Sequence, residues 1–470
     1  MRVTWVQPED LLPHELLASR EEGRPVGDVE ARWVAAGGPA RPPVGGASPE
    51  PASPRLRALA DELLDELERV AVPDSAEEPD ELSAIRAGWP TQFGPAGSGR
   101  ADSGLAGSGR AGSGRAAPDG DRYDRLHGAW LGRAVGCLVG KPVEKVPRQG
   151  IREILEATGR WPLSDYFTAV GLPEDVAARW PWNRASRTTS LVENIDGMPE
   201  DDDLNYPLIA LYLLERHGPE FTSDDVAKAW LDLLPGGRVF TAERIAYRNL
   251  LLGMDPPATA RVRNPFRQWI GAQIRTDLYG WVNPGRPDRA AEQAFRDARI
   301  SHVRNGVYGA MYAAAMGAAA LVESDVNRVL DAGLAVVPPR SRFAEAVRFA
   351  RDAAGRETDW ERIADAIYDR YGDLHWVHVL PNAALLTAAI AYGAGDFERS
   401  VFAVVSGGWD TDSSGATVGG VLGALHGARA LPERLVRPLR NRLASSVPGF
   451  AAAGGIGFDS LAERTLKVAA

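Results

Sequence analysis

Glycine recurs at every fourth position near the C-terminal end of the chain, at Gly415, Gly419, Gly423 and Gly427. If this segment is helical, the four glycines lie on one face, one on each turn. A glycine inside a helix costs roughly 1 kcal/mol relative to alanine, so a regular stripe makes sense only where close packing uses it. A face without side chains lets a second backbone approach. The stripe therefore predicts a helix in tight contact with another element, which also fixes the loop ahead of it.

Alanine-rich runs with helical periodicity dominate the chain from about residue 120 onward. They cover residues 209–217, 224–234, 288–299, 306–322, 343–354, 360–371, 382–394 and 416–430. Strand-like alternation of apolar and polar residues is scarce in the same region. We therefore expect an all-α domain over residues 120–470, with its active-site loops at helix starts.

Residues 1–93 carry helical signals of their own. Ser53 and Pro54 form an N-cap followed by proline at the first helical position. Leucine then recurs at helical spacing as far as Val70, which gives a helix with one apolar face. That face needs a partner, either the helix suggested by LLPHELLASREEG or the main domain. We interpret this part as a docking or regulatory region.

A flexible linker is expected between the two regions, over residues 94–119. The segment repeats AGSGR and has almost no large apolar side chain. Such a segment cannot bury enough surface to offset its ordering entropy. A solvated tether is the expected role.

Charge and composition exclude several classes of protein. The net charge of −10 argues against a general nucleic-acid-binding surface, which needs clustered Lys and Arg. The single cysteine, Cys137, excludes an intrachain disulfide. The first residues have no apolar core of a signal peptide, and the longest apolar stretch is too short to cross a bilayer. We therefore expect a cytoplasmic protein with no membrane partner.

Two acidic clusters are the strongest chemical signal. The first is Asp201, Asp202 and Asp203, which precede the apolar run LNYPLIALYLLERHG. One aspartate at a helix start is an ordinary N-cap, but three adjacent carboxylates repel one another unless they are solvated or share a cation. Oxygen ligands without His or Cys favour Mg²⁺, Mn²⁺ or Ca²⁺ over zinc. The first cluster therefore predicts metal ligands.

The second cluster lies just before the glycine stripe, in GGWDTDSSGATVGG. Asp410 and Asp412 are separated by one residue, so on an extended loop both carboxylates can face one pocket. Ser413 adds a hydroxyl oxygen. The rigid helix expected behind them would hold these three groups in place. We predict that both clusters converge around divalent cations.

The chain resembles the ADP-ribosylglycohydrolases from about residue 122 to its end. The motifs that carry the resemblance are DRLHGAWLGRAVGCLVGKPVE, the first acidic cluster, SHVRNGVYGAMYAAAMG and GWDTDSSGATVGG. The resemblance implies a compact orthogonal all-α domain and a centre of two Mg²⁺ or Mn²⁺ ions. It also implies cleavage of the glycosidic bond at C1″ of ADP-ribose, with an ADP-ribosylated protein among the expected partners.

Carried over by position, the resemblance assigns metal ligands to Asp202, Asp203, Asp410, Asp412 and Ser413. Asp201 and Leu204 stand where the family has threonines, and we expect Asp201 to be an additional ligand. Cys137 stands where many relatives have aspartate. Glu144 matches a glutamate near the metals, so we expect it, with Asp202, to be catalytic. For Glu144 the expected role is proton transfer or substrate gating.

Eight further residues are candidates for binding the substrate. Gly136 and Gly140 would let backbone amides approach a diphosphate. His302, Asn305 and Gly306 form a helix start that the resemblance places near the adenine and phosphate site. The remaining candidates are His378, Asn382 and Trp409, and Trp409 could stack on a base or pack in the core. For the histidines, satisfied core positions are the common alternative.

Two other functions are compatible with the same residues. One is a binding or structural module that keeps the fold without turnover, which the substitutions at Asp201 and Leu204 leave open. The other is a hydrolase of another ribosyl compound, such as a nucleoside. Products distinguish the three: released ADP-ribose, tight binding without product, or released free base.

Overall fold

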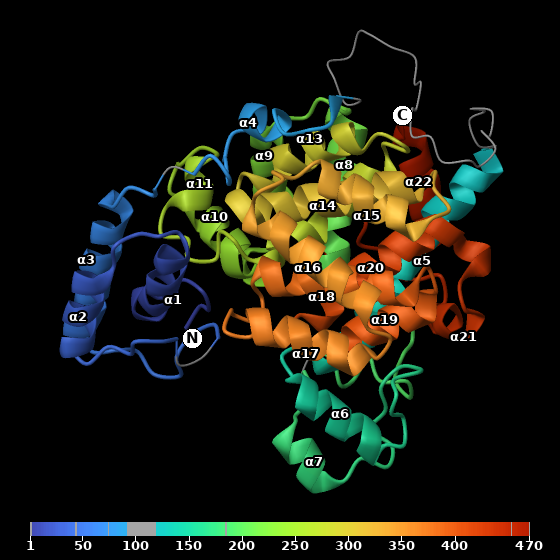
Figure 1. Cartoon of the computed structure of the whole chain (residues 1–470), viewed down its shortest axis with the longest axis horizontal. Coiled ribbons are helices and arrows are strands. Elements are labelled where there is room, and N and C mark those ends of the chain that lie inside the picture. The colour runs from blue at the N-terminus through green and yellow to red at the C-terminus, as the bar shows by residue number, and fades with distance from the viewer. Residues whose placement is uncertain are drawn as a thin grey trace.

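Helices and irregular segments make up the computed structural model (Figure 1). It describes residues 2–42, 45–73, 75–91, 119–183, 186–452 and 454–469. Within these ranges there is no β-strand, and extended pairing is limited to three isolated bridges. The predicted all-α fold is confirmed. Of the predicted linker, 94–119, only Asp119 lies inside the described residues, so that assignment stays a prediction.

The N-terminal region contains four helices, α1 (Pro8–Glu21), α2 (Gly27–Ala35), α3 (Pro54–Arg69) and the short α4 (Leu82–Arg86). As predicted, the Ser53 hydroxyl accepts a hydrogen bond from the backbone N–H of Leu56 and caps α3. The apolar face of α3 packs on both α1 and α2. Trp33 on α2 is fully buried among them. The expected helix partner for α3 is therefore α1, together with α2.

The larger region begins with α5 (Asp119–Gly140) and runs to the C-terminal helix α22 (Phe458–Val468). Between them lie η2 (Lys141–Val143), α6 (Arg148–Ala157), α7 (Glu174–Arg179), α8 (Asp202–His217), α9 (Ser223–Leu233), η3 (Gly236–Arg238), α10 (Thr241–Leu251), α11 (Ala258–Arg261), η4 (Ile270–Arg275), α12 (Asp277–Trp281), α13 (Pro287–Ala298) and α14 (Arg304–Ala320). They are followed by α15 (Val326–Ala335), α16 (Arg342–Arg356), α17 (Trp360–Tyr371), α18 (Val379–Gly393), α19 (Phe397–Ser406), α20 (Thr411–His426), η5 (Ala428–Ala430), α21 (Glu433–Val436) and η6 (Arg437–Leu439). Each of the eight predicted helical runs coincides with one of these helices.

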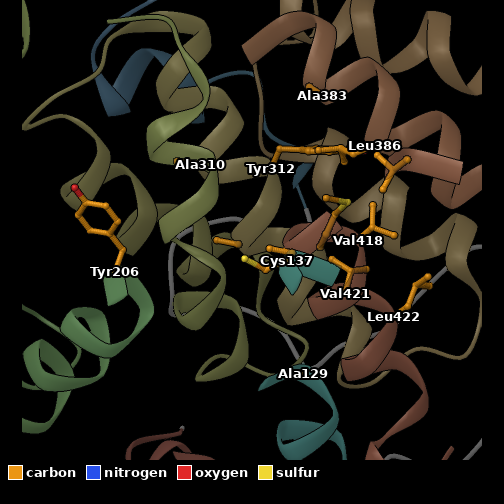
Figure 2. Packing of buried hydrophobic residues seen from close by; sticks show 14 of the residues in the cluster. Ala129, Cys137, Tyr206, Ala310, Tyr312, Ala383, Leu386, Val418, Val421 and Leu422 are labelled. Carbon is orange, nitrogen blue, oxygen red and sulfur yellow. The ribbon is translucent and has the colours of Figure 1, made fainter. Parts of the chain in front are cut away.

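The helix α20 packs on α5 along the predicted glycine stripe. A matching stripe on α5, at every fourth residue from Gly128 to Gly140, faces it in the opposite order. A Cβ atom placed on Gly132 would overlap the backbone of Gly419, and one on Gly136 would overlap Gly415. The two backbones are thus in direct contact. Figure 2 shows Cys137 of α5 beside Val418 and Val421 of α20 within one core.

The N-terminal region and the larger region share a second hydrophobic core. Trp5 and Leu16 lie in it together with Phe266, Trp269 and Ile245 of the larger region. The rings of Trp5 and Phe266 meet edge to face with centroids 5.3 Å apart. We call this contact surface the seam. It shows that residues 2–91 are packed against the larger region.

Candidate metal centre

The C-terminal end of α5 meets the N-terminal ends of α8 and α20 at one point. The Thr411 hydroxyl donates a hydrogen bond of 2.8 Å to the carbonyl of Gly140, the last residue of α5. On the neighbouring side, Nε of the buried Arg133 on α5 donates to the carbonyl of Asp203 at 2.8 Å. These contacts bring the two acidic clusters, about two hundred residues apart in sequence, to the same helix end.

The side chains form two groups of possible ligands. In one, ligand atoms of Glu144, Asp410 and Asp412 all lie within 4.8 Å of one another. In the other, ligand atoms of Cys137, Asp201 and Asp203 do so. The electrostatic influence of Asp412 reaches Asp202, Asp203 and Glu144, so the two groups belong to one site. The geometry therefore supports the predicted convergence of the two acidic clusters.

Burial and mutual repulsion disfavour ionisation of these carboxyls. Burial raises the pKa of Asp203 and of Asp410 well above the ordinary value, and the nearby Asp412 raises both further. The same two causes raise the pKa of Asp202. They also raise the pKa of Glu144, to about 7. The site without a cation therefore holds more negative groups than its surroundings can compensate.

Glu144 stands at the rim of the site. Its side chain is 18% exposed, one oxygen accepts a hydrogen bond of 2.5 Å from the Asn183 amide, and the other lies 3.3 Å from the ammonium of Lys145. That ammonium lies 5.6 Å from the ring centroid of Trp376. Glu144 is thus held in a fixed orientation while one side of it faces solvent.

A hard divalent cation fits the donor set. The donors are carboxylate oxygens, with the buried Ser413 hydroxyl beside Asp412. The buried oxygen Oδ1 of Asp203 accepts no hydrogen bond and lies 3.8 Å from the Arg133 guanidinium, so its hydrogen-bonding capacity is unused. The exception is Cys137, whose thiol lies 3.7 Å from Asp203 and whose pKa burial raises well above the ordinary value. Leu204, at the second threonine position, is fully buried and offers no donor.

Asp201 has partners for both of its carboxylate oxygens. Oδ1 accepts the backbone N–H of Asp203 at 2.9 Å, which caps α8. Oδ2 forms an ion pair with the buried ammonium of Lys141. Asp201 thus fulfils the N-cap role that its position in the sequence allows, in addition to lying within reach of the ligand cluster.

Gly136 and Gly140 do not face a free space that a diphosphate could occupy. Their Cα atoms lie against the backbones of Gly415 and of Thr411 and Asp412. Both are buried within α5. The absence of a side chain at these two positions serves the contact between α5 and α20 rather than the approach of a diphosphate.

Asn382 and Trp409 support the second acidic cluster from behind. The Asn382 carbonyl oxygen accepts the backbone N–H of Asp410 at 3.2 Å, and its amide donates to the carbonyls of Trp376 and His378 at 2.8 and 2.9 Å. Trp409 is stacked on Tyr368 with centroids 4.1 Å apart. Of the two alternatives for Trp409, core packing describes its environment. Both residues position Asp410.

The other four substrate candidates lie at or near the seam. His378 contacts Glu21 of α1 at 3.1 Å, and the Asn305 amide donates to Glu78 at 3.0 Å. Gly306 lies against the backbone of Arg267. His302 is fully buried, bonded to Ser301 at 2.8 Å, and burial lowers its pKa well below the ordinary value. The helix start that the resemblance places near the adenine and phosphate site is in contact with Glu78 and Asp80 of the N-terminal region.

Two buried cations of the site were missed by sequence reasoning. Arg133 is fully buried and also pairs with Asp277 at 3.0 Å. Lys141 is buried and pairs with Asp201. The available signal was positional: each is a cation inside or just after the apolar, glycine-rich second half of α5. A cation in such a segment has to find a carboxylate when the helix is buried.

Comparisons with known proteins were made for the whole chain. The family model described as ADP-ribosylglycohydrolase matches residues 118–468. An uncharacterized protein of Archaeoglobus fulgidus is 24% identical over 328 residues, which is 68% of this chain and 92% of that protein. A solved structure titled "ADP-ribosylglycohydrolase-related protein complex" covers 75% of this chain and all of its own, with 19% identity and a TM-score of 0.39. Because the family model spans most of the sequence, the chain belongs to the ADP-ribosylglycohydrolase family.

Proposed function

We propose that this protein hydrolyses the glycosidic bond between ADP-ribose and a modified protein, nucleic acid or small molecule. Membership of the family supports a glycohydrolase-type enzyme. The observation that carries the finer proposal is that Glu144, Asp410 and Asp412 form one close group of acids, whose Asp412 raises the pKa of Asp202 and Asp203. Within the described ranges no helix has the length and apolar character needed to cross a membrane.

Asp202, Asp203, Asp410, Asp412 and the hydroxyl of Ser413 would hold two Mg²⁺ or Mn²⁺ ions. When bound, such ions can orient the ribose hydroxyls and lower the pKa of a coordinated water. The Asp203 oxygen that accepts no hydrogen bond and the raised pKa values of Asp203 and Asp410 support this assignment. Asn382 holds the backbone of Asp410 in the position that the ligand set needs.

Glu144 would donate or accept the proton that the reaction requires. Hydrolysis breaks the bond from C1″ to the leaving atom, adds the hydroxyl of water to C1″ and requires a proton on the leaving group. With a pKa raised to about 7, Glu144 can exchange a proton near neutral pH. Asn183 and Lys145 contact its two oxygens, and the Lys145 ammonium also lies 5.6 Å from the ring centroid of Trp376.

The decisive experiment measures release of ADP-ribose. Purified protein is incubated with Mg²⁺ or Mn²⁺ and a panel of conjugates linked through arginine, serine, an acetyl group or a nucleobase. Asp412→Asn is expected to lower the rate at least about 100-fold, because it removes a proposed ligand. Asp175→Asn is the matched control, since Asp175 is an exposed aspartate paired with Arg179 on α7.

The panel also separates the alternatives. Release of a free base from nucleosides, without release of ADP-ribose, would identify a different ribosyl hydrolase. Tight binding of ADP-ribose without any product would identify a binding module. Full activity in Asp412→Asn and in Asp202→Asn would contradict the proposed metal chemistry.

A further inference from the structure

The ion pair between Lys141 and Asp201 is the feature of the site that the proposed chemistry does not use. Lys141 is 8% exposed and Asp201 is 6% exposed, so both charges are removed from water. Lys141 begins η2, immediately after α5, and Asp201 caps α8. The pair therefore ties the end of one helix to the start of another, at the point where the proposed ligands begin.

We propose that Asp201 is the internal counter-ion of Lys141, and that this pair positions Asp202 and Asp203 in place of an additional metal ligand. The proposal deepens the proposed function, on which its statement about metal ligands rests. The coupling between Lys141 and Asp201 is a property of the protein alone and does not depend on the proposed function. Both oxygens of Asp201 already have partners, one in Lys141 and one in the backbone N–H of Asp203.

The charges of the site agree with this role. The carboxylates of Asp201, Asp202, Asp203, Asp410, Asp412 and Glu144 carry six negative charges when all are ionised. Two divalent cations would neutralise four of them. Lys141, paired with Asp201, and Lys145, 3.3 Å from Glu144, supply the other two, since the charge of Arg133 is balanced by Asp277 at 3.0 Å. Without Lys141, Asp201 would add an uncompensated buried charge, which is strongly unfavourable.

The local geometry gives the pair a positioning function. Because Asp201 caps the first turn of α8, any movement of Asp201 moves Asp202 and Asp203, the next two residues. Arg133 holds the carbonyl of Asp203 from the other side at 2.8 Å. Lys141 and Arg133 both belong to α5 or its direct continuation. Lys141 and Arg133, on α5 and its direct continuation, therefore both bind the start of α8.

The test is a double-mutant cycle with Lys141→Met, Asp201→Asn and both together, read out as melting temperature in the presence of a chelator. Lys141→Met alone is expected to lower the melting temperature by roughly 5 °C or more, because it leaves a buried carboxylate unpaired. Asp201→Asn keeps an N-cap oxygen and is expected to do less harm. The double variant should be more stable than Lys141→Met. Lys228→Met, an exposed lysine on α9, is the control.

The second readout is binding of Mg²⁺ and Mn²⁺ by calorimetry. Asp201→Asn is expected to keep the number of ions of the unaltered protein, with an affinity within about threefold. Loss of an ion, or weakening beyond tenfold, would make Asp201 a ligand and overturn the proposal. Additive changes in melting temperature would overturn it as well.

The two readouts keep the proposals apart. If the unaltered protein binds no divalent cation, the proposed function fails, while the cycle in chelator still decides whether the pair is coupled. If Lys141→Met does not fold, Lys141→Arg and the double variant replace it. Folding of the double variant together with Lys141→Arg supports the pair, whereas failure of the double variant to fold contradicts it.

Discussion

Two sets of buried carboxylates, one at the seam and one at the candidate metal centre, have different partners. At the seam, Arg267 is almost fully buried and contacts Glu15 at 2.8 Å and Glu22 at 2.6 Å. Arg342 contacts Glu78 at 2.8 Å. At the metal centre, the carboxylates of Asp203 and Asp410 face other carboxylates.

The pKa values show the consequence. Burial alone would raise the pKa of Glu22, but the Arg267 guanidinium lowers it to about 2. For Glu144, burial and the neighbouring Asp412 act in the same direction and raise the pKa to about 7. Acids with arginine partners join two parts of the chain. Acids without sufficient cations are the ones whose charge the proposed divalent ions would compensate.

The largest expected effect is on the seam. Arg267→Met leaves Glu15 and Glu22 buried without their cation, so the free energy of unfolding should fall by about 3–5 kcal/mol. Denaturant unfolding measures it. Adding Glu15→Gln and Glu22→Gln should restore part of the loss. No recovery in the triple variant would mean that Arg267 acts through packing rather than through charge.

The next largest effect is expected on how strongly Mg²⁺ stabilises the protein at different pH values. The folded-state pKa of Glu144 lies above its ordinary value of 4.5, so the metal-free protein loses stability as pH rises from about 4.5 through 7. Each unit of this shift corresponds to about 1.4 kcal/mol. Bound Mg²⁺ would offset the free-energy cost of ionising Glu144 in the folded protein. The difference in melting temperature between Mg²⁺ and chelator should therefore grow over this range.

Taking the difference removes the contributions of groups outside the site, whereas the raised pKa values of Asp202, Asp203 and Asp410 contribute together with that of Glu144. Burial lowers the pKa of His14 to about 4 and of His375 to about 3, so their stabilisation is lost as pH falls below 6.5 in both conditions. Glu22 behaves likewise between 4.5 and about 2. If the melting temperatures with and without Mg²⁺ changed in parallel with pH, this would contradict the contrast between the seam and the metal centre. The substitution Glu144→Gln should reduce the increase of this difference with pH.

The smallest effect is expected where seam charges are exposed. Arg263 pairs with Asp61 at 2.7 Å and Asp65 at 2.5 Å, and all three side chains are partly in solvent. Arg263→Met should cost at most about 1 kcal/mol, and less at high salt. Unfolding at two ionic strengths checks this. A loss as large as that of Arg267→Met would show that burial does not separate the two kinds of pair.

The sequence predicted those features that are local in the chain. The Ser53 cap, the eight helical runs and the glycine stripe from Gly415 onward are periodic or positional signals, and each is found. The acidic clusters could be recognised because three adjacent aspartates have few ordinary explanations. Their meeting was inferred from chemistry and from the resemblance.

What could not be predicted depends on partners far apart in the chain. Nothing near Glu22 in the sequence indicates Arg267, and nothing near Lys141 indicates Asp201. The same holds for Asn305, whose contact with Glu78 follows from how the N-terminal region packs. A side chain's residue type says that it needs a partner, but only the tertiary structure says which one.

The glycine contact between α5 and α20 has a mechanical consequence. Glu144 follows the end of α5 closely and Asp412 lies in the first turn of α20, so main-chain contact sets the spacing between these two acids. A single methyl group added at Gly136 would press on the backbone of Gly415 and thereby shift the start of α20, without touching any of the proposed ligands.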